Sequence, residues 1–200
     1  MLVARSSADL EEVDDRVRAR GGQATLVPLD LRDGKAIDRL GGVLAERYGH
    51  LDVLIGNAAE LGVLSPTGHI DPKVFERVMA LNAGANHRLI RSLDPLLRAA
   101  DHGRAIFVTC AQAREPKPFW GAYGASKAAL EALVLSYAAE TRRARLRVNL
   151  VDPGPMRTRL RERAYPGEAK DKAPLPDTRT DAFVALADPG CMRHGELVIA

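Results

Sequence analysis

The sequence predicts an α/β protein with a doubly wound parallel sheet and helices on both faces. Short apolar runs alternate along the chain with segments in which apolar residues recur at helical spacing. The apolar runs end in small or polar residues, as buried parallel strands do where a sheet meets a ligand. Apolar residues make up 46% of the 200 residues and aromatic residues only 4%, which is typical of helices packed on a parallel sheet. The length predicts a single domain over residues 1–200.

The apolar runs give the expected strands, and the segments between them give the helices. Strands are expected at 2–4, 24–29, 51–55, 105–108, 146–151 and 196–199. Helices are expected at 7–20, 34–48, 71–100, 122–141 and 180–187. Ser7 is the expected N-cap of the first helix, and residues 30–33 are expected to cap the second. Residues 164–178 contain three prolines and several charges, which predicts a mobile loop.

Charge and cysteine content bear on the class of protein. The net charge is +3, and the densest basic group, at 142–147, has no interleaved aromatic residues. We therefore interpret it as a solvated helix end and expect no nucleic-acid partner. Cys110 and Cys191 are the two cysteines, too few for a disulfide framework, which predicts a reducing, cytoplasmic location. No apolar run approaches the ~18 residues of a membrane span, so no membrane partner is expected.

Tyr123 and Lys127 stand out because they are four residues apart at the start of a predicted helix. This spacing places both side chains on one face of the helix. A nearby ammonium favours a phenolate, so Lys127 is expected to lower the pKa of Tyr123 from its usual value of about 10. The pair would then transfer a proton near neutral pH. The alternative is an ordinary helix with a half-buried tyrosine and a solvated lysine.

Residues that follow successive predicted strands are expected to meet at one rim of the sheet. They are Arg5, Asp30, residues 56–59, Thr109 with Cys110, and residues 152–154. In a doubly wound sheet, ligands bind beyond the carboxyl ends of the strands. Each of these residues alone has an alternative explanation in turn geometry. Together with Tyr123 and Lys127 they favour a site.

At these positions the chain resembles the short-chain dehydrogenases/reductases. The motifs are Tyr-Gly-Ala-Ser-Lys at 123–127, Gly-Asn-Ala-Ala at 56–59, Leu-Asn-Ala-Gly at 81–84 and Pro-Gly-Pro-Met-Arg-Thr at 153–158. The resemblance covers essentially the whole chain. It implies a Rossmann-type fold and transfer of hydride between a nicotinamide cofactor and a carbonyl or alcohol substrate.

The resemblance also implies roles for single residues. Tyr123 would be the general acid/base, Lys127 would lower its pKa and hold the nicotinamide ribose, and Asn82 would anchor a proton-relay water. The implied cofactor-binding residues are Arg5, Ser6, Asp30, Leu31, Asn57, Ala58, Ala59, Tyr123, Lys127, Pro153, Gly154 and Thr158. Residues 164–178 would form the substrate lid, and no metal is implied.

The residues after the first apolar run bear on the choice of cofactor. Enzymes that use NAD place a carboxylate there, whereas the 2′-phosphate of NADP requires a cation. Ala4 stands where the acid would be, and Arg5 and Ser6 follow. We therefore expect NADP(H) rather than NAD. The alternative for Arg5 is an ordinary surface arginine.

Two features depart from the family pattern. The family begins with a strand and a Gly-rich turn that holds the cofactor pyrophosphate, whereas this chain starts at what would be the second strand. The absent strand would be the middle one, between residues 2–4 and 51–55. We interpret the sequence as a truncated form of a longer chain. The alternative is that the gap is real and that cofactor affinity is strongly reduced. Cys110 also replaces the usual serine that hydrogen-bonds the substrate carbonyl. If Cys110 takes this catalytic role, it polarises the substrate less well, because a thiol is a weak donor, and Thr109 or Gln112 can substitute. The alternative is that Cys110 is a small buried residue without a role.

The resulting functional hypothesis is an NADP(H)-dependent oxidoreductase acting on a small carbonyl or alcohol. The alternative is a catalytically impaired relative that acts as a binding or oligomerisation module. In this family the helices at 71–100 and 122–141 commonly pair between subunits, so a homodimer or homotetramer is expected. The sequence does not identify the substrate.

Overall fold

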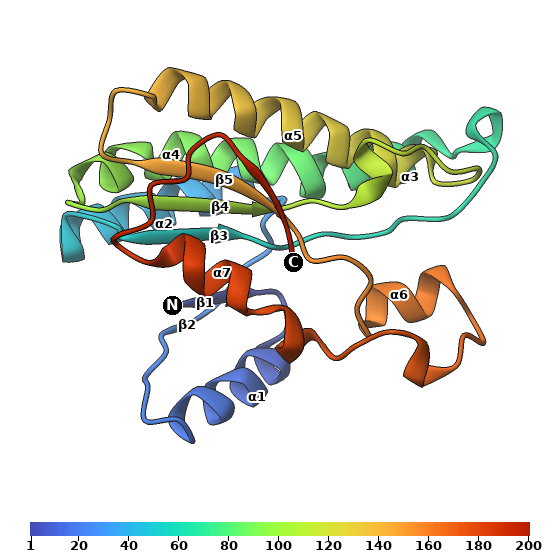
Figure 1. Ribbon diagram of the computed structural model, residues 1–200, viewed down its shortest axis with the longest axis horizontal. Coiled ribbons are helices and arrows are strands. Elements are labelled where there is room, and N and C mark those ends of the chain that lie inside the picture. Colours follow the sequence, from blue (N-terminus) through green and yellow to red (C-terminus); the bar gives the residue numbers. More distant parts are fainter.

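The computed structural model describes residues 1–169 and 171–200 and has the predicted α/β architecture (Figure 1). The strands are β1 Leu2–Ala4, β2 Leu26–Pro28, β3 Val53–Gly56, β4 Arg104–Val108, β5 Arg147–Asp152 and β6 Leu197–Ile199. The helices are α1 Ser7–Arg18, α2 Gly34–Tyr48, α3 Pro72–Met79, α4 Ala85–Ala99, α5 Gly121–Thr141, α6 Arg159–Ala164 and α7 Asp181–Ala187. Apart from α6, each helix and strand lies within a segment predicted to have that structure or overlaps it closely.

The strands form two parallel ladders that are not hydrogen-bonded to each other. One pairs β1 with β2, and the other has the order β3-β4-β5-β6. In the larger ladder Ile55 pairs with Ile106, and Val151 pairs with Val198. The interruption lies between β1 and β3, which is where the sequence predicted that the middle strand is absent.

Alternation along the strands assigns side chains to the two faces of the larger ladder. Successive strand residues point to opposite faces. Ala105 and Phe107 pack in the core cluster that contains residues of α2, α4 and α5. Ile106 and Val151 pack instead against Leu186 of α7. Figure 1 shows the corresponding layers, with α4 and α5 on one side of the sheet and α7 and α1 on the other.

Helices cover the α7 face less completely near β3. The Ile55 side chain on β3 is 45% exposed, whereas its pairing partner Ile106 is 1% exposed. The cause is the interrupted sheet, because no described strand pairs with the free edge of β3. The carboxyl ends of β3, β4 and β5 nevertheless lie at one edge, which is where the site residues follow.

The segment predicted as one long helix contains a local change of helical pitch. Asp71 caps α3 by accepting hydrogen bonds from the main chain of Lys73 and Val74. A π-helical turn, Ala80–Gly84, separates α3 from α4. Such turns are rare and occur frequently at functional sites. Here the turn contains Asn82, one of the predicted site residues.

Two local predictions need correction. The N-cap of α1 is Ser6 rather than Ser7, since the Ser6 hydroxyl accepts a hydrogen bond from the Asp9 main chain. The predicted loop at 164–178 is preceded by a short helix, α6, which Thr158 caps through the Arg161 main chain. Ion pairs Arg159–Asp9 and Arg16–Asp177 tie this part of the chain to α1.

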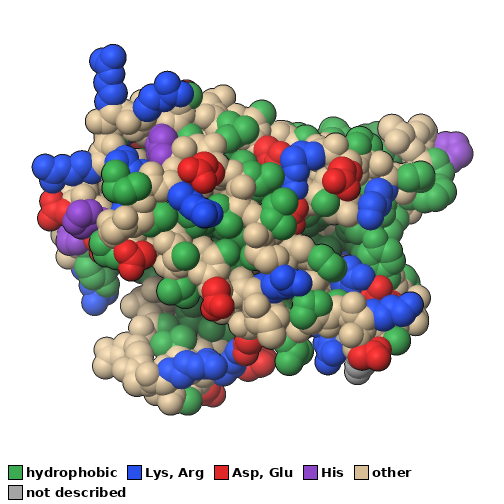
Figure 2. Space-filling model, in the orientation of Figure 1, with side chains coloured by type: hydrophobic (Ala, Val, Ile, Leu, Met, Phe, Trp, Pro, Cys, Tyr) green, Lys and Arg blue, Asp and Glu red, His purple; other side chains and the backbone are tan. Residues whose placement is uncertain are grey.

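The surface carries mixed charge. On the face shown in Figure 2, basic and acidic side chains are interspersed over the upper body and over α1 below it. Among the described residues, no helix combines the length and the apolar character needed to span a bilayer.

Candidate active site

Tyr123 and Lys127 lie one turn apart near the beginning of α5. Gly124, between them, permits close approach to the turn that follows β4, because a Cβ there would lie 2.9 Å from the Gln112 carbonyl oxygen. The Lys127 Nζ is 5.9 Å from the centre of the Tyr123 ring. The four-residue spacing therefore places both side chains on one face, as predicted.

Lys127 is a buried cation. Lys127 is only 2% exposed, and its Nζ donates a hydrogen bond to the Val108 carbonyl oxygen at 2.7 Å. This bond uses one of the three ammonium donors. Burial lowers the pKa of Lys127 to about 8, while the nearby Cys110, Asp152 and Glu131 act in the opposite direction. The ammonium is thus costly to hold and has donors left for a ligand.

The pKa of Tyr123 differs from the prediction. Tyr123 is 7% exposed, and burial is the largest cause that raises the pKa of its hydroxyl well above the usual value. Cys110 and Asp152 raise it further. The expectation that Lys127 lowers the pKa of Tyr123 is therefore wrong for this structure, because burial of the phenol disfavours its charged form and is the largest cause of the shift.

Cys110 occupies the predicted position beside Tyr123. Its side chain packs against the cluster that contains Tyr123, and burial raises the pKa of the thiol although Lys127 opposes this. Cys110 is therefore a neutral thiol next to the phenol. Thr109, considered as its substitute, donates its hydroxyl to Glu131 Oε1 at 2.6 Å, so this hydroxyl hydrogen is committed to the protein.

Asn82 connects the π-helical turn to α5. Its Oδ1 accepts from the Glu60 main chain at 2.8 Å, and its Nδ2 donates to the Glu60 carbonyl oxygen and to Ser126 Oγ, each at 2.9 Å. Ser126 in turn donates to the Tyr123 carbonyl oxygen at 2.7 Å. The side chain of Asn82 is thus saturated with protein partners, which fixes the position of α5 relative to the end of β3.

Aromatic and aliphatic side chains cover Tyr123. Trp120 lies edge-on to Tyr123, with ring centres 5.8 Å apart, and Tyr165 lies at the same distance from Trp120. Leu160 and Ala164 of α6 belong to the same cluster. The cover over Tyr123 therefore begins in α6, before the predicted lid at 164–178. A cavity of about 220 Å³ adjoins it, lined by residues that include Arg157, Tyr165 and Ala173.

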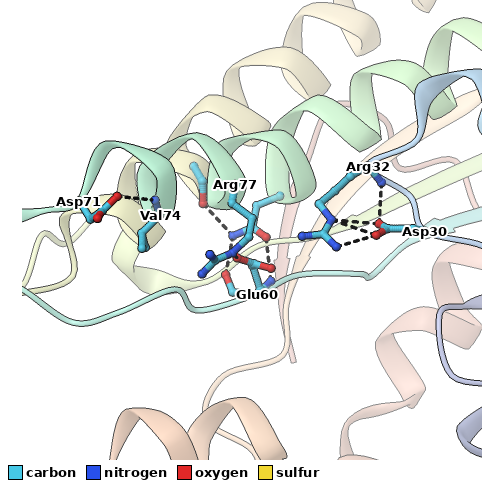
Figure 3. A network of polar contacts seen from close by, with 8 residues as sticks. Asp30, Arg32, Glu60, Asp71, Val74 and Arg77 are labelled. Carbon is cyan, nitrogen blue, oxygen red and sulfur yellow. Dashed lines mark hydrogen bonds and ion pairs between the residues drawn. The ribbon is translucent and has the colours of Figure 1, made fainter.

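A second group of predicted residues lies at the ends of β1 and β2. Arg32 binds the Asp30 carboxylate through Nε and Nη2, at 3.0 and 2.6 Å (Figure 3). This hydrogen bonding lowers the pKa of Asp30 to about 2, with a smaller contribution from Arg5. Arg5 is exposed, and Ser6 caps α1. Among the described residues, no hydrogen bond or ion pair joins this group to Tyr123 and Lys127.

The remaining predicted residues follow β2, β3 and β5. Asn57 is exposed, Ala58 and Ala59 are half-buried, and Leu31 and Ala58 pack against the main core. Glu60, next along the chain, is paired with Arg77 (Figure 3). At β5, the buried Pro153 precedes Gly154, whose φ of +67° favours glycine. Thr158 uses its hydroxyl to cap α6.

The sequence did not reveal an ion-pair network beside the site. Arg114 binds both Glu131 and Asp152, and Asp152 Oδ1 accepts from the Gly154 main chain at 3.0 Å. Glu131 is one turn after Lys127, so the sequence alone could have placed this carboxylate near the lysine. The role of Arg114 could not be predicted, since its partners lie 17 and 38 residues away along the chain.

The structure also bears on metal binding. Within the described residues, no group of three or more His, Cys, Asp or Glu side chains is arranged to hold a metal ion.

Comparison with known proteins finds relatives that are named as oxidoreductases or reductases. The oxidoreductase YciK of Escherichia coli K12, itself uncharacterised, is 34% identical over 179 residues, which are 88% of this chain and 71% of YciK. A fatty acyl-CoA reductase of Acinetobacter baylyi is 36% identical over 141 residues, 70% of this chain. The chain spans only about half of that reductase, 48%.

Solved structures of similar proteins superpose closely. A short-chain dehydrogenase from Shigella flexneri 2a, in complex with NADP, has a TM-score of 0.93 at 31% identity and covers 99% of this chain and 84% of its own. A second, from Escherichia coli CFT073 in complex with NADPH, has a TM-score of 0.93 at 32% identity, with the same coverage. The family model described as short chain dehydrogenase matches residues 1–169. The chain is therefore a member of the short-chain dehydrogenase family of oxidoreductases.

Proposed function

We propose that this chain is an NADP(H)-dependent oxidoreductase that interconverts a carbonyl compound and an alcohol at Tyr123. The observation that carries the proposal is the buried Lys127 ammonium beside a buried phenol and the Cys110 thiol. A protein gains no stability from burying a cation that retains free donors. A functional site is the usual place for such a group.

The residues present fit part of a dinucleotide cofactor. The remaining donors of Lys127 suit the hydroxyls of the nicotinamide ribose, and the small side chains of Ala58 and Ala59 permit close approach of a flat ligand. Arg5, together with the N-terminus of α1, suits a phosphate at the other end. Within the described residues, no Gly-rich turn follows a strand to hold the diphosphate. When bound, the cofactor supplies the hydride.

Tyr123 is proposed as the proton donor in carbonyl reduction. Because its pKa is raised, the phenol remains protonated at neutral pH and presents an O–H to the substrate oxygen. As that oxygen gains negative charge, the Tyr123 proton moves to it, and the Lys127 ammonium stabilises the phenolate that remains. In alcohol oxidation the same proton moves in reverse.

Asn82 and the covering segment are proposed to act around this proton transfer. The Asn82 side chain is occupied, so a relay water would bind its main-chain carbonyl oxygen, which already accepts one hydrogen bond from Asn86. Residues 164–178 are proposed, with α6, as the substrate lid. A homodimer or homotetramer remains a proposal, supported by Leu135 of α5, which is 45% exposed.

Turnover measurements test the proposed function. We expect the chain to oxidise NADPH in the presence of some members of a panel of aldehydes and ketones. If a folded chain produces no turnover over the panel, the proposal is contradicted. The chain would then act as a binding or oligomerisation module, the alternative that the interrupted sheet and Cys110 favour.

Replacing Cys110 by serine is expected to increase turnover. A hydroxyl is a stronger hydrogen-bond donor than a thiol, and one neutral hydrogen bond contributes about 1 kcal/mol, or roughly fivefold in rate. Cys110→Ala should have the opposite effect. The measurement is kcat on the best substrate, with Cys191→Ser as the matched control. Equal kcat values for the serine and alanine variants would show that Cys110 has no role in the reaction.

Replacing Arg5 by alanine is expected to change cofactor preference. Loss of a charge-assisted bond of about 1.5–3 kcal/mol should weaken NADPH binding roughly tenfold to a hundredfold, while NADH binding changes little. The readout is the ratio of kcat/KM for the two cofactors. Arg20→Ala, two residues beyond the end of α1, is the control. A ratio that is unaffected by Arg5→Ala would make Arg5 an ordinary surface residue.

A further inference from the structure

Arg114 connects two carboxylates that flank Lys127. Its Nη2 donates to Asp152 Oδ2 at 2.6 Å, and its Nη1 donates to Glu131 Oε1. The Thr109 hydroxyl donates to the same Glu131 oxygen. The network thus ties together the turn after β4, the helix α5 and the end of β5, which are the three segments around the reactive pair.

Both carboxylates are sheltered from water, so their charges are weakly screened. The side chain of Asp152 is 6% exposed and that of Glu131 is 13% exposed. Lys127 is faced by Glu131 and Tyr123 from its own helix, by Cys110 from the turn after β4 and by Asp152 from β5. Without a cation between them, two negative charges would act on one buried ammonium.

We propose that Arg114 is a positioning residue of the active site, which partly offsets the negative charges of Glu131 and Asp152 and thereby sets the protonation of Lys127 and Tyr123. The inference rests on the proposed function, in which Lys127 and Tyr123 are the working groups. Arg114 does not have to touch a ligand for this role. A purely structural clamp would contribute to stability but would leave the titration of Lys127 unchanged.

The test is the pH midpoint of Lys127, followed by NMR of its side-chain resonances in the chain without ligand. Arg114→Gln frees both carboxylates, so the midpoint should rise by about one pH unit from its starting value near 8. Glu131→Gln removes one of the two negative charges and leaves Arg114 paired with Asp152, so the midpoint should fall. The double variant Arg114→Gln/Glu131→Gln should lie between the two single variants.

Matched controls separate the network from a general effect of charge. Arg145→Gln removes an exposed Arg–Asp pair near the end of α5 and should leave the midpoint unchanged. Arg114→Lys keeps the charge and should shift the midpoint less than Arg114→Gln. If Arg114→Gln does not fold, two variants still test the inference. The Lys127 midpoint should fall in Glu131→Gln and should shift only slightly in Arg114→Lys.

The result that would overturn the inference is a midpoint that stays constant in Arg114→Gln, or that moves in the same direction in Glu131→Gln. This outcome is distinct from failure of the proposed function, because the titration uses no cofactor. A chain without NADPH turnover could still show the shift. A chain with turnover and no shift would lose only the role of Arg114.

Discussion

Replacing Tyr123 by phenylalanine is expected to lower kcat by roughly 10²–10⁴, the usual contribution of a positioned general acid. The substitution removes one hydroxyl and keeps the ring, so contacts with Trp120 and with the cover of α6 remain. NADPH affinity should change little, because Lys127 is retained. The measurements are kcat on the best carbonyl substrate and the Kd for NADPH.

Tyr137 supplies a matched control for this prediction. It is a buried tyrosine on the same helix, and its hydroxyl donates to Asp94 Oδ1 at 2.7 Å. Tyr137→Phe therefore also removes a buried hydroxyl, at a distance from Lys127 along α5, and should affect stability rather than kcat. Equal kcat values for Tyr123→Phe and the unmodified chain would remove Tyr123 from the mechanism.

Replacing Lys127 by methionine is expected to reduce activity and increase stability. The ammonium holds the ribose and stabilises the phenolate in the proposed mechanism, so NADPH affinity should fall roughly tenfold to a hundredfold and kcat should fall as well. Lowering its pKa from 10.5 to about 8 corresponds to about 3 kcal/mol of destabilisation at neutral pH. Loss of the bond to the Val108 carbonyl costs about 1 kcal/mol. The free energy of unfolding of Lys127→Met should therefore be about 2 kcal/mol higher than that of the unmodified chain.

The pH dependence of stability follows from the sign of this shift. Because the folded pKa of Lys127 lies below the unfolded value, the folded protein loses its proton first as pH rises. Between pH of about 8 and 10.5 the unfolded state binds more protons, so the contribution of Lys127 to stability rises with pH in that window. NADPH affinity should fall as pH rises through about 8, because the ammonium is lost.

Urea unfolding at several pH values checks this account. The rise in the free energy of unfolding above pH of about 8 should be missing in Lys127→Met. It should be present in the unmodified chain and in Lys35→Met, a variant of an exposed lysine on α2. A destabilised Lys127→Met variant would show that Lys127 is a structural residue.

Most of the fold followed from the sequence because its signals are local. The alternation of apolar runs and helical segments located the strands and most helices, and Asp33 caps α2 within the predicted segment. The helix α6 has little apolar periodicity, and Leu160 and Ala164 gain their partners only from Tyr123 and its neighbours. The N-cap of α1 is Ser6, one residue before the predicted Ser7. The sequence offers two adjacent serines, and only the backbone geometry decides which of them caps the helix.

The site was only partly predictable because its chemistry depends on burial. The four-residue spacing of Tyr123 and Lys127 placed them together, but the sequence carried no measure of how deeply α5 would be covered. That burial reverses the expected direction of the Tyr123 pKa. Arg114, Glu131 and Asp152 meet from separate segments, so only the folded chain reveals their network.

In the proposed mechanism, a reduced nicotinamide binds beside Tyr123 on the Lys127 ammonium. Trp120 is the only tryptophan of the chain, and its ring lies 5.8 Å from that of Tyr123, so it reports on this place. Titration with NADPH should quench Trp120 emission and give saturable, sensitised NADPH emission, weakened in Lys127→Met. Unchanged Trp120 emission, or equal quenching in the Lys127→Met variant, would show that the nicotinamide does not bind on Lys127 beside Tyr123.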